Sequence, residues 1–323
     1  MNITEIKNDL HRVRNALMAL QNEDKTIGYF TNPSFAKLKY PNGCCLTASN
    51  LLYLYLREKY DITTLKLGFG NSTEEEIFGF EHYWLEWENK YYLDITADQF
   101  TKNKKDSVIF DEIETNMFYQ RFSYNRGNKT LSPDKLEDLL KKVKCKIKEL
   151  MKEEFILTEI WSLSISAAFQ RANVYTNSID ENLRNDFKKN LRKHIEIIAE
   201  QYQNTVDEAK HLANIKLVAE CKNDCLSNRE LNFGVSQKLL NLYLKYLWCL
   251  DKIPTPPHFP VDRLIQEKLK VTKVISWTKG MDDDTDYLKI IAKAKIKADL
   301  EGLSIAEWEL KNFKRRSEET ITK

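Results

Sequence analysis

The chain has 323 residues, of which 42% are apolar and 30% are charged, with only 9 Gly and 7 Pro. This composition excludes collagen-like, low-complexity and wholly disordered chains, and it indicates a folded globular protein with enough apolar material for two domains. The net charge of +2 combines −3 over residues 1–127 with +5 over residues 128–323. So mild a basic excess permits a nucleic-acid-binding face on the second part, but it is equally typical of a solvated lysine-rich helical surface.

The sequence predicts a cytoplasmic protein. No stretch approaches the roughly 18 uninterrupted apolar residues of a membrane span, so we expect no contact with a membrane. The first residues are charged and amphipathic, unlike a signal peptide. Six Cys in a chain of this length are too few for a disulfide scaffold, so each is first a buried apolar residue or a reactive thiol.

Residues 1–127 have the pattern of an α+β domain. Apolar periodicity predicts helices over residues 4–22 and 45–58. Aromatic and β-branched residues predict short strands over 64–69, 81–87 and 90–95, with a tight hairpin turn at Asn89-Lys90. Six of the nine Gly lie in this part, as expected where the chain turns often. A helix followed by a small antiparallel sheet is the fold that this order predicts.

The rest of the chain is predicted to be helical. Ser132-Pro133 is a typical helix start, and an apolar stripe predicts a helix from 133 to 152. We therefore assign residues 128–152 to a linker helix and residues 153–323 to an all-α domain with a Pro-rich turn over 253–260. Its helices are expected near 155–172, 180–219, 235–250, 262–270, 284–299 and 304–315.

One cysteine, one histidine and one aspartate follow each other in an order that suits nucleophilic catalysis. A turn leads into the helix predicted from Cys45, and a helix N-terminus stabilises a thiolate and can bind an oxyanion. His82 lies on a predicted strand and could serve as the base. Asp94 lies on the next strand, where a hairpin would bring its carboxylate to the second ring nitrogen of His82. Each residue alone is usually structural, and only the joint arrangement is specific.

Three motifs carry a resemblance to a known family. They are Gly43-Cys-Cys followed by a Leu-rich helix, His82-Tyr-Trp-Leu-Glu, and Tyr92-Leu-Asp-Ile-Thr-Ala-Asp-Gln-Phe. Together they resemble the motifs of transglutaminase-like cysteine hydrolases of bacteria, a branch of the papain-like fold. The resemblance covers residues 30–120.

The resemblance implies a role for each matching position. Cys45 would be the nucleophile, His82 the base and Asp94 the acid that orients it, and Cys44 is the alternative nucleophile. Asp98 and Gln99 would support the site or bind an oxyanion, or would simply cap the strand. The family usually has a small residue where Tyr83 stands, so its bulk would narrow the cleft.

The implied activity is that of a thiol-dependent hydrolase or acyltransferase. It would act on amide, peptide or isopeptide bonds of a protein or peptide substrate through a covalent thioester, with the helical domain serving recognition. No cofactor and no metal is expected.

The helical part contains a second candidate pair, Lys238 and Asp262. The segment around Gly234 reads as a glycine turn feeding a helix whose first N–H groups would face outward and bind a DNA phosphate. The layout resembles helix-hairpin-helix DNA glycosylases, although Ser236 replaces the second glycine of the usual hairpin. The resemblance implies that Lys238 attacks the sugar carbon or positions the base, and that Asp262 stabilises positive charge on the sugar.

The same pair has a plain structural interpretation, in which Asp262 is the N-cap of the following helix and Lys238 is a solvated first-turn residue. The alternative function is therefore a nucleic-acid-binding or DNA glycosylase-like protein whose N-terminal domain is regulatory.

Overall fold

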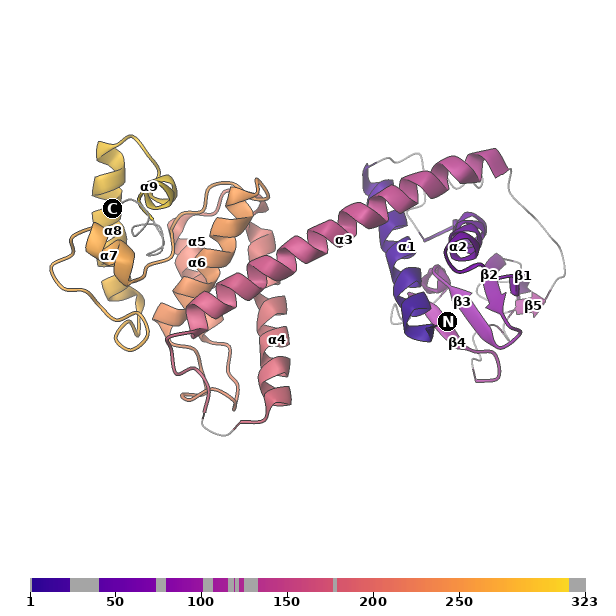
Figure 1. Cartoon of the computed structure of the whole chain (residues 1–323), viewed down its shortest axis with the longest axis horizontal. Helices are drawn as coiled ribbons and strands as arrows, with labels where there is room; N and C mark the ends of the chain where they lie inside the picture. The colour runs from indigo at the N-terminus through magenta and orange to yellow at the C-terminus, as the bar shows by residue number, and fades with distance from the viewer. Residues whose placement is uncertain are drawn as a thin grey trace. The chain divides into compact units, whose positions relative to one another are not determined.

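The computed structural model describes residues 2–23, 41–73, 80–100, 107–115, 119, 122–124, 133–176 and 179–313. The chain divides into two compact units, Met1–Glu154 and Phe155–Lys323. The first unit combines helices with a five-stranded antiparallel sheet, and the second is helical over its described residues (Figure 1). The predicted mixed α/β part followed by a helical part is therefore confirmed at this level.

The first unit contains a sheet with strand order β4-β3-β2-β1-β5, in which every pair of neighbours is antiparallel. Its elements are α1 (Ile3–Glu23), α2 (Cys45–Tyr60), β1 (Leu65–Ser72), β2 (Glu81–Trp87), β3 (Tyr91–Asp94), η4 (Ala97–Gln99), β4 (Ile109–Glu112) and β5 (Phe122–Tyr124). The sequence predicted the helices and the three central strands but not β4 and β5, which are too short to show a period.

The β2–β3 turn differs from the predicted one by a residue. Glu88 and Asn89 both have positive φ, 56° and 52°, and the N–H of Lys90 donates to the carbonyl of Trp87 at 2.9 Å. Positive φ at both central residues matches the twist of a hairpin. The turn is therefore centred on Glu88 and Asn89 rather than on Asn89 and Lys90.

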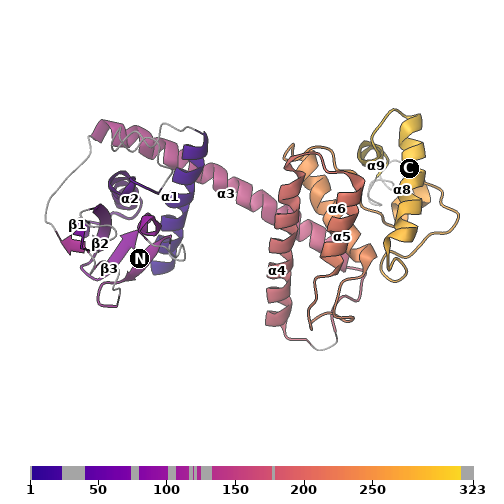
Figure 2. The ribbon, with the colours of Figure 1, turned by 180° about the vertical axis from the view of Figure 1, so that it is seen from behind.

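The two faces of β2 have different environments. Leu85 and Trp87 point to one face, where they pack in a core with Leu51 and Leu52 of α2. Residues of α1 and of the start of α3 (Pro133–Phe169) complete this core, and Figures 1 and 2 show α1 and α2 beside the sheet. By alternation, the even-numbered residues of β2 point to the opposite face, where a smaller aromatic cluster lies.

Two glycines of β1 make room for that aromatic cluster. Gly68 pairs with Trp84 across the β1–β2 ladder, and a Cβ on Gly68 would lie 2.2 Å from the indole nitrogen. Gly70 pairs with His82, and a Cβ there would lie 2.8 Å from the Cβ of Phe122. Only glycine at these positions lets the indole of Trp84 lie across β1.

Helix α3 is one continuous helix of 37 residues, where the sequence predicted two helices over 133–152 and 155–172. The chain has neither Pro nor Gly between residues 134 and 233, so nothing in its sequence forces a break. Buried residues between 136 and 147 pack with the first unit, and those between 160 and 168 belong to the core of the second. The described part of the expected linker over 128–152 lies within the first compact unit, which ends at Glu154.

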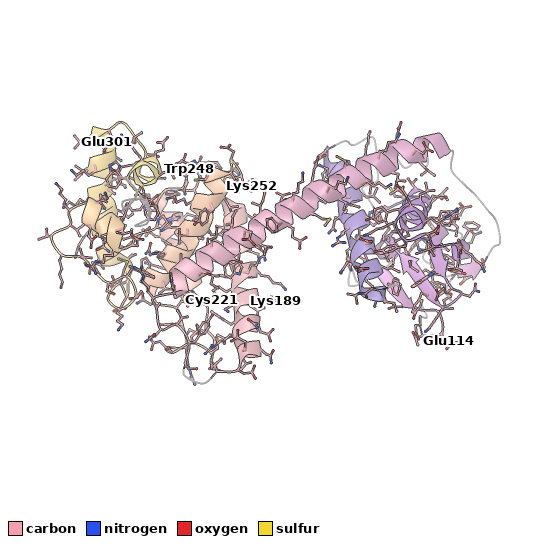
Figure 3. The ribbon with its side chains drawn as sticks, viewed as in Figure 1. Glu114, Lys189, Cys221, Trp248, Lys252 and Glu301 are labelled. Carbon is pink, nitrogen blue, oxygen red and sulfur yellow. The ribbon has the colours of Figure 1, made fainter. Side chains whose placement is uncertain are left out.

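The second unit is built around one large apolar core that all of its longer helices share. Its elements are the end of α3, α4 (Glu181–Glu200), η6 (Gln201–Gln203), α5 (Glu208–Ala219), α6 (Phe233–Cys249), α7 (Arg263–Lys268), α8 (Asp284–Leu300) and α9 (Ile305–Asn312). Glu301, labelled in Figure 3, joins the last two helices by accepting hydrogen bonds from Trp308 and Lys311.

The predicted helix over 180–219 is interrupted. Asn204 is extended, with φ −119° and ψ 166°, and Asp207 then caps α5 by accepting from the N–H of Lys210 at 2.7 Å. The apolar periodicity over 180–219 suggested a single helix, but Asp207 acts as an N-cap and begins a second one. Within the described ranges, no helix is both long enough and apolar enough to cross a bilayer.

Candidate active site

A tight turn places two adjacent cysteines at the start of α2. The N–H of Cys44 donates to the carbonyl of Pro41 at 3.1 Å, and Gly43 has φ 68°. This positive φ favours glycine, which explains Gly43 directly before the cysteines. Cys44 is the N-cap and Cys45 is the first helical residue, so the predicted position of a thiol at the helix start is confirmed.

The two thiols have different surroundings, although both are buried. Burial, together with the charge of Cys45, raises the pKa of Cys44 to about 11, and its sulfur lies 3.5 Å from the carbonyl oxygen of Asn42. The sulfur of Cys45 instead lies 3.9 Å from the carbonyl oxygen of Glu81, at the start of β2. Cys45 also acts on His82 through hydrogen bonding and charge, both of which raise the pKa of His82. Of the two thiols, Cys45 is therefore the one that raises the pKa of the imidazole.

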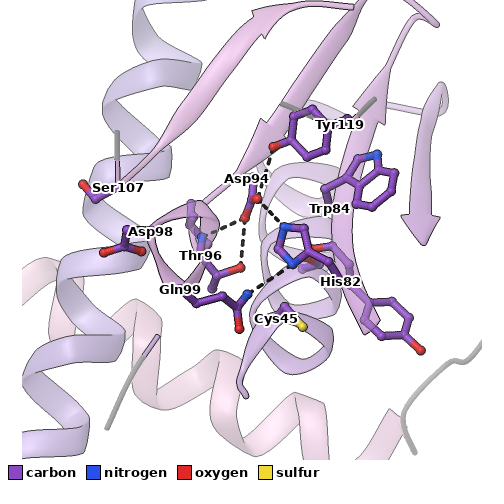
Figure 4. A network of polar contacts seen from close by, with 12 residues as sticks. Cys45, His82, Trp84, Asp94, Thr96, Asp98, Gln99, Ser107 and Tyr119 are labelled. Atoms are coloured by element: carbon purple, nitrogen blue, oxygen red, sulfur yellow. Dashed lines mark hydrogen bonds and ion pairs between the residues drawn. The ribbon is translucent and has the colours of Figure 1, made fainter. Parts of the chain in front are cut away.

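His82 and Asp94 form a buried pair across the β2–β3 hairpin. Leu85 pairs with Leu93, so Asp94 lies diagonally from His82 on the same face of the sheet. The imidazole Nε2 is 2.7 Å from Asp94 Oδ2, and both side chains are fully buried (Figure 4). The predicted contact between these two residues is therefore present, and Figure 4 shows His82 between Asp94 and Cys45.

Three further hydrogen bonds hold the carboxylate of Asp94. Oδ1 accepts from the backbone N–H of Thr96 at 2.7 Å and from its hydroxyl at 2.9 Å. Oδ2 accepts from the hydroxyl of Tyr119 at 3.1 Å as well as from His82. Burial, followed by the charge of Asp94, raises the pKa of Tyr119 well above its usual value, so its hydroxyl stays protonated and remains a donor.

The pKa of His82 results from opposing effects. Burial favours the neutral ring, and the rings of Trp84, Phe100 and Phe122 surround it. The charge of Asp94 and its hydrogen bond outweigh burial and raise the pKa to about 9, with Cys45 adding to the effect. The site therefore favours a positively charged imidazole next to a thiol.

Gln99 bridges the cysteine turn and the histidine. Its Nε2 is 3.1 Å from His82 Nδ1, and its Oε1 accepts from the N–H of Gly43 at 3.2 Å. When the ring is neutral and its proton on Nε2 is donated to Asp94, Nδ1 accepts a hydrogen bond from this amide, whereas a ring protonated on both nitrogens cannot accept it. Gln99 therefore contacts the imidazole directly, which is the position that a supporting role requires.

Asp98, the other expected supporting residue, serves a different purpose. Its two carboxylate oxygens accept from Arg14 of α1 at 3.1 and 2.6 Å, and Arg14 also donates to the carbonyl of Ile95. This forked contact is mostly buried and fixes η4, the turn that carries Gln99.

Tyr83 is buried within the sheet, where its bulk was expected to narrow a cleft. Its ring stacks on Phe69 with centroids 4.6 Å apart, and both rings pack with Cys45 in a small cluster. Its backbone carbonyl accepts from Ser49, one turn after Cys45 on α2. Tyr83 therefore fixes the start of α2 against β2.

Lys238 and Asp262 also meet, in the second unit. Nζ of Lys238 is 3.2 Å from Asp262 Oδ2 and lies over the ring of Trp277, 4.3 Å from its centroid. Burial lowers the pKa of Lys238 against the opposing effect of Asp262. The interpretation of Lys238 as a solvated residue is therefore wrong, whereas Asp262 does cap α7 by accepting from the N–H of Ile265 at 3.1 Å.

The glycine segment before Lys238 is not an open anion-binding turn. Gly234 already lies in α6, and its N–H donates to Asn232 Oδ1 at 2.8 Å and to the carbonyl of Met281 at 2.9 Å. The N–H of Ser236 is also bonded, to the carbonyl of Asn232. A Cβ on Gly234 would lie 2.0 Å from the carbonyl oxygen of Trp277, so the glycine is needed for packing. The predicted phosphate contact through these N–H groups is wrong.

Three residues of the N-terminal site were not found from the sequence: Thr96, Tyr119 and Arg14. Thr96 had a local signal, because a threonine two residues after an aspartate often closes a turn on that carboxylate. Tyr119 and Arg14 lie 25 residues after Asp94 and 84 residues before Asp98, and no local pattern links them to the site.

A scan against protein-family models found no match, and neither did searches of curated proteins and of solved structures. Within the described residues, no group of three or more His, Cys, Asp or Glu side chains is arranged to hold a metal ion.

Proposed function

We propose that the first unit is a thiol-dependent hydrolase or acyltransferase with a transglutaminase-like, papain-like fold. It acts on amide, peptide or isopeptide bonds of a protein or peptide substrate. The observation that supports this proposal is the buried imidazole of His82, which has a carboxylate at one ring nitrogen and acts with Cys45 at the start of α2. A cytoplasmic location suits the six cysteines, all of which are free.

The proposed reaction starts from the state in which the thiol proton of Cys45 has passed to Nδ1 of His82, whose raised pKa favours the imidazolium. The thiolate attacks the substrate carbonyl carbon, and the imidazolium then protonates the leaving amine as the carbon–nitrogen bond breaks. The thioester that remains is attacked by water, which releases an acid, or by a second amine, which forms a new amide. Asp94 keeps the ring oriented and stabilises its positive charge throughout.

Gln99 has a defined role in the proposed reaction. Its amide holds Nδ1 in the resting geometry, so it must release that nitrogen when the thiol proton arrives. Because its other end is bonded to Gly43, release of the imidazole leaves the amide beside the start of α2, where negative charge develops on the substrate oxygen.

The test is alkylation by iodoacetamide, followed for each cysteine by peptide mass spectrometry. In wild-type protein and in Cys44→Ser, we expect Cys45 to be alkylated readily, because the positively charged imidazole of His82 stabilises a thiolate beside it. In Cys45→Ser, Cys44 should react slowly, since burial, the larger cause of its raised pKa, remains. The exposed Cys145 reports the reagent's activity within each sample.

His82→Ala is the decisive variant in this experiment. It should slow alkylation of Cys45 at least tenfold without changing Cys145, because the base is lost. Undiminished labelling of Cys45 in His82→Ala would falsify the assignment. Fast labelling of Cys44 in Cys45→Ser would transfer the nucleophile's role to Cys44.

We propose a second candidate function for the second unit, binding or cleavage of DNA at a damaged nucleotide. The contact between Lys238 and Asp262 favours it, since a lysine with a lowered pKa is a better nucleophile and a neighbouring carboxylate can stabilise positive charge on a sugar. The lysine amine would attack C1′ of an abasic site and form an imine with loss of water.

Borohydride, which reduces an imine to a stable amine, tests this candidate. The full-length protein should become covalently attached to a labelled abasic duplex in the presence of borohydride, and Lys238→Gln should abolish attachment. Lys189→Gln, at an exposed lysine labelled in Figure 3, is the matched control and should leave attachment unchanged. Absence of attachment in wild-type protein, or equal loss in both variants, would exclude a nucleophilic Lys238.

A further inference from the structure

The second unit has a cavity whose lining includes neither Lys238 nor Asp262. It has a volume of about 600 Å³ and lies between the loop of residues 271–276 and α8. This volume is within the range of small-molecule sites, which is about 300–1,000 Å³. Its walls combine aliphatic side chains, including Val271 and Ile290, with several charged ones.

Cations outnumber anions among the residues that line the cavity. Lys273, Lys289 and Lys293 contribute three positive charges, and Asp286 contributes one negative charge. Lys289 binds Asp286 at 2.8 Å, so these two charges offset each other. The remaining two lysines leave an excess charge of +2 at the cavity.

These two lysines have no carboxylate partner within the described part of the chain. Nζ of Lys293 donates to the backbone carbonyl of Lys270 at 2.5 Å, a contact that orients the ammonium without neutralising it. Lys273 is exposed and has neither an ion pair nor a side-chain hydrogen bond to a described residue. Both ammonium groups can therefore bind an anion without first breaking a salt bridge.

The loop wall is held in place by a buried glutamine. Gln266 is fully buried, and its amide both accepts from the N–H of Ile275 at 2.8 Å and donates to its carbonyl at 2.9 Å. This double contact fixes Ile275 and the adjoining Ser276, whose hydroxyl can donate to a ligand oxygen. The wall therefore exists before a ligand binds, which reduces the cost of ordering it on binding.

We propose that this cavity binds a phosphate group of a phosphorylated ligand. Lysine ammonium groups are compact charges suited to phosphate oxygens, and a phosphate dianion matches the excess charge of +2. The aliphatic residues on the wall contact the organic part of the ligand. The proposal rests on neither of the two functions proposed above, because the cavity shares no residue with either site.

The experiment uses the full-length protein and three probes: pyrophosphate, adenosine monophosphate and a fluorescent single-stranded 12-mer. Binding is measured at a low salt concentration of about 50 mM, where contacts to phosphate are strongest. Binding of the two small probes identifies a free phosphorylated molecule as the ligand class. Binding of the 12-mer alone, with strong salt dependence, identifies a nucleic-acid strand as the source of the phosphate.

Two variants distinguish binding at the cavity from a non-specific effect of positive charge. They are the double variant Lys273→Ala/Lys293→Ala and the control Lys297→Ala. Lys297 is exposed one turn beyond Lys293 on α8 and does not line the cavity. We expect the double variant to weaken binding about tenfold or more and the control about twofold at most. Failure of all three probes to bind, or equal weakening by Lys297→Ala and the double variant in proteins with unchanged unfolding midpoints, would overturn the proposal.

Discussion

His82 Nε2 and Asp94 Oδ2 lie 2.7 Å apart with both side chains buried, and the carboxylate has no contact with bulk water that could replace a lost donor. The charges of such a pair are stabilised by neighbouring protein groups rather than by solvent. Removing one charge therefore lowers the free energy of unfolding strongly. The donors around it nevertheless differ in importance, because His82 exchanges a proton in the proposed reaction and the other donors do not.

Asp94→Asn should lower both the stability and the thiol reactivity of the first unit. Loss of the buried negative charge should cost about 3 kcal/mol of unfolding free energy, and alkylation of Cys45 should slow at least tenfold. Tyr119→Phe removes only one neutral donor to the same oxygen and should cost about 1 kcal/mol with little change in reactivity. Urea unfolding and alkylation rates measure both effects, and equal loss of reactivity in the two variants would contradict the special role of the charge.

The stability of the first unit should depend on pH through His82. Its pKa in the folded protein is raised to about 9, above its ordinary 6.5. A raised pKa means that the folded state binds the proton more tightly, so this contribution is fully present below pH 6.5 and is lost as pH rises through about 9. The difference in urea midpoint between wild type and His82→Gln should therefore shrink from pH 6 to pH 9.5. A difference that stays constant would mean that the imidazole is not held in its charged form.

Gly68→Ala should disturb the aromatic cluster next to His82. The added Cβ would lie 2.2 Å from the indole nitrogen of Trp84, so the indole must move, at a cost of about 1–3 kcal/mol. Gly280→Ala is a suitable control, because its Cβ would meet nothing closer than 3.6 Å. Thermal unfolding should separate the two variants, and near-ultraviolet circular dichroism should change for Gly68→Ala alone. Equal melting temperatures would show that the cluster tolerates the displacement.

The second unit should be sensitive to acid because of two buried histidines. Burial lowers the pKa of His211 to about 3 and that of His258 to about 4, the first assisted by the charge of His258 and the second opposed by Glu208. Tyr202 and Tyr287 bond their Nδ1 atoms at 2.8 and 3.0 Å.

Both histidines are therefore neutral when folded, whereas the unfolded chain takes up protons below pH 6.5, so stability falls as pH drops from 6.5 towards 4. Hydrogen exchange of α5 and α6 peptides, corrected for intrinsic rates, should show more frequent opening at pH 5 than at pH 7. His258→Gln should reduce the difference, and an unchanged difference would assign the acid sensitivity to other groups.

The sequence predicted the parts of the N-terminal site that depend on local spacing. The strand containing His82 and the one containing Asp94 were placed by their aromatic and β-branched residues, and a hairpin of that length leaves few registers that keep Leu85 and Leu93 in the core. Cys45 was placed at a helix start by the glycine that precedes the cysteines. These predictions needed only patterns that extend over about ten residues.

Other features depend on contacts that no local pattern contains. Arg14 binds Asp98, and Tyr119 binds Asp94, across long stretches of chain. The role of Gly234 was misread for the same reason, because the backbone of Trp277 lies against it and its N–H is used by Met281. In the sequence, a glycine packed against a distant segment of the same chain cannot be distinguished from one that forms an open turn.

Helix α3 contains an exposed stretch at which the chain could be cleaved into two parts. Residues 151–156 are all exposed, so this stretch contributes to neither core although the helix continues through it. Its helical state rests on intrinsic propensity, and Lys152, Glu153 and Glu154 are good helix formers. A protease site introduced there should yield two halves that each keep every buried residue of their own core. The proposed thiol chemistry and the proposed lysine chemistry could then be tested on separate polypeptides, and recombining the halves would reveal whether either half alters the rate measured for the other.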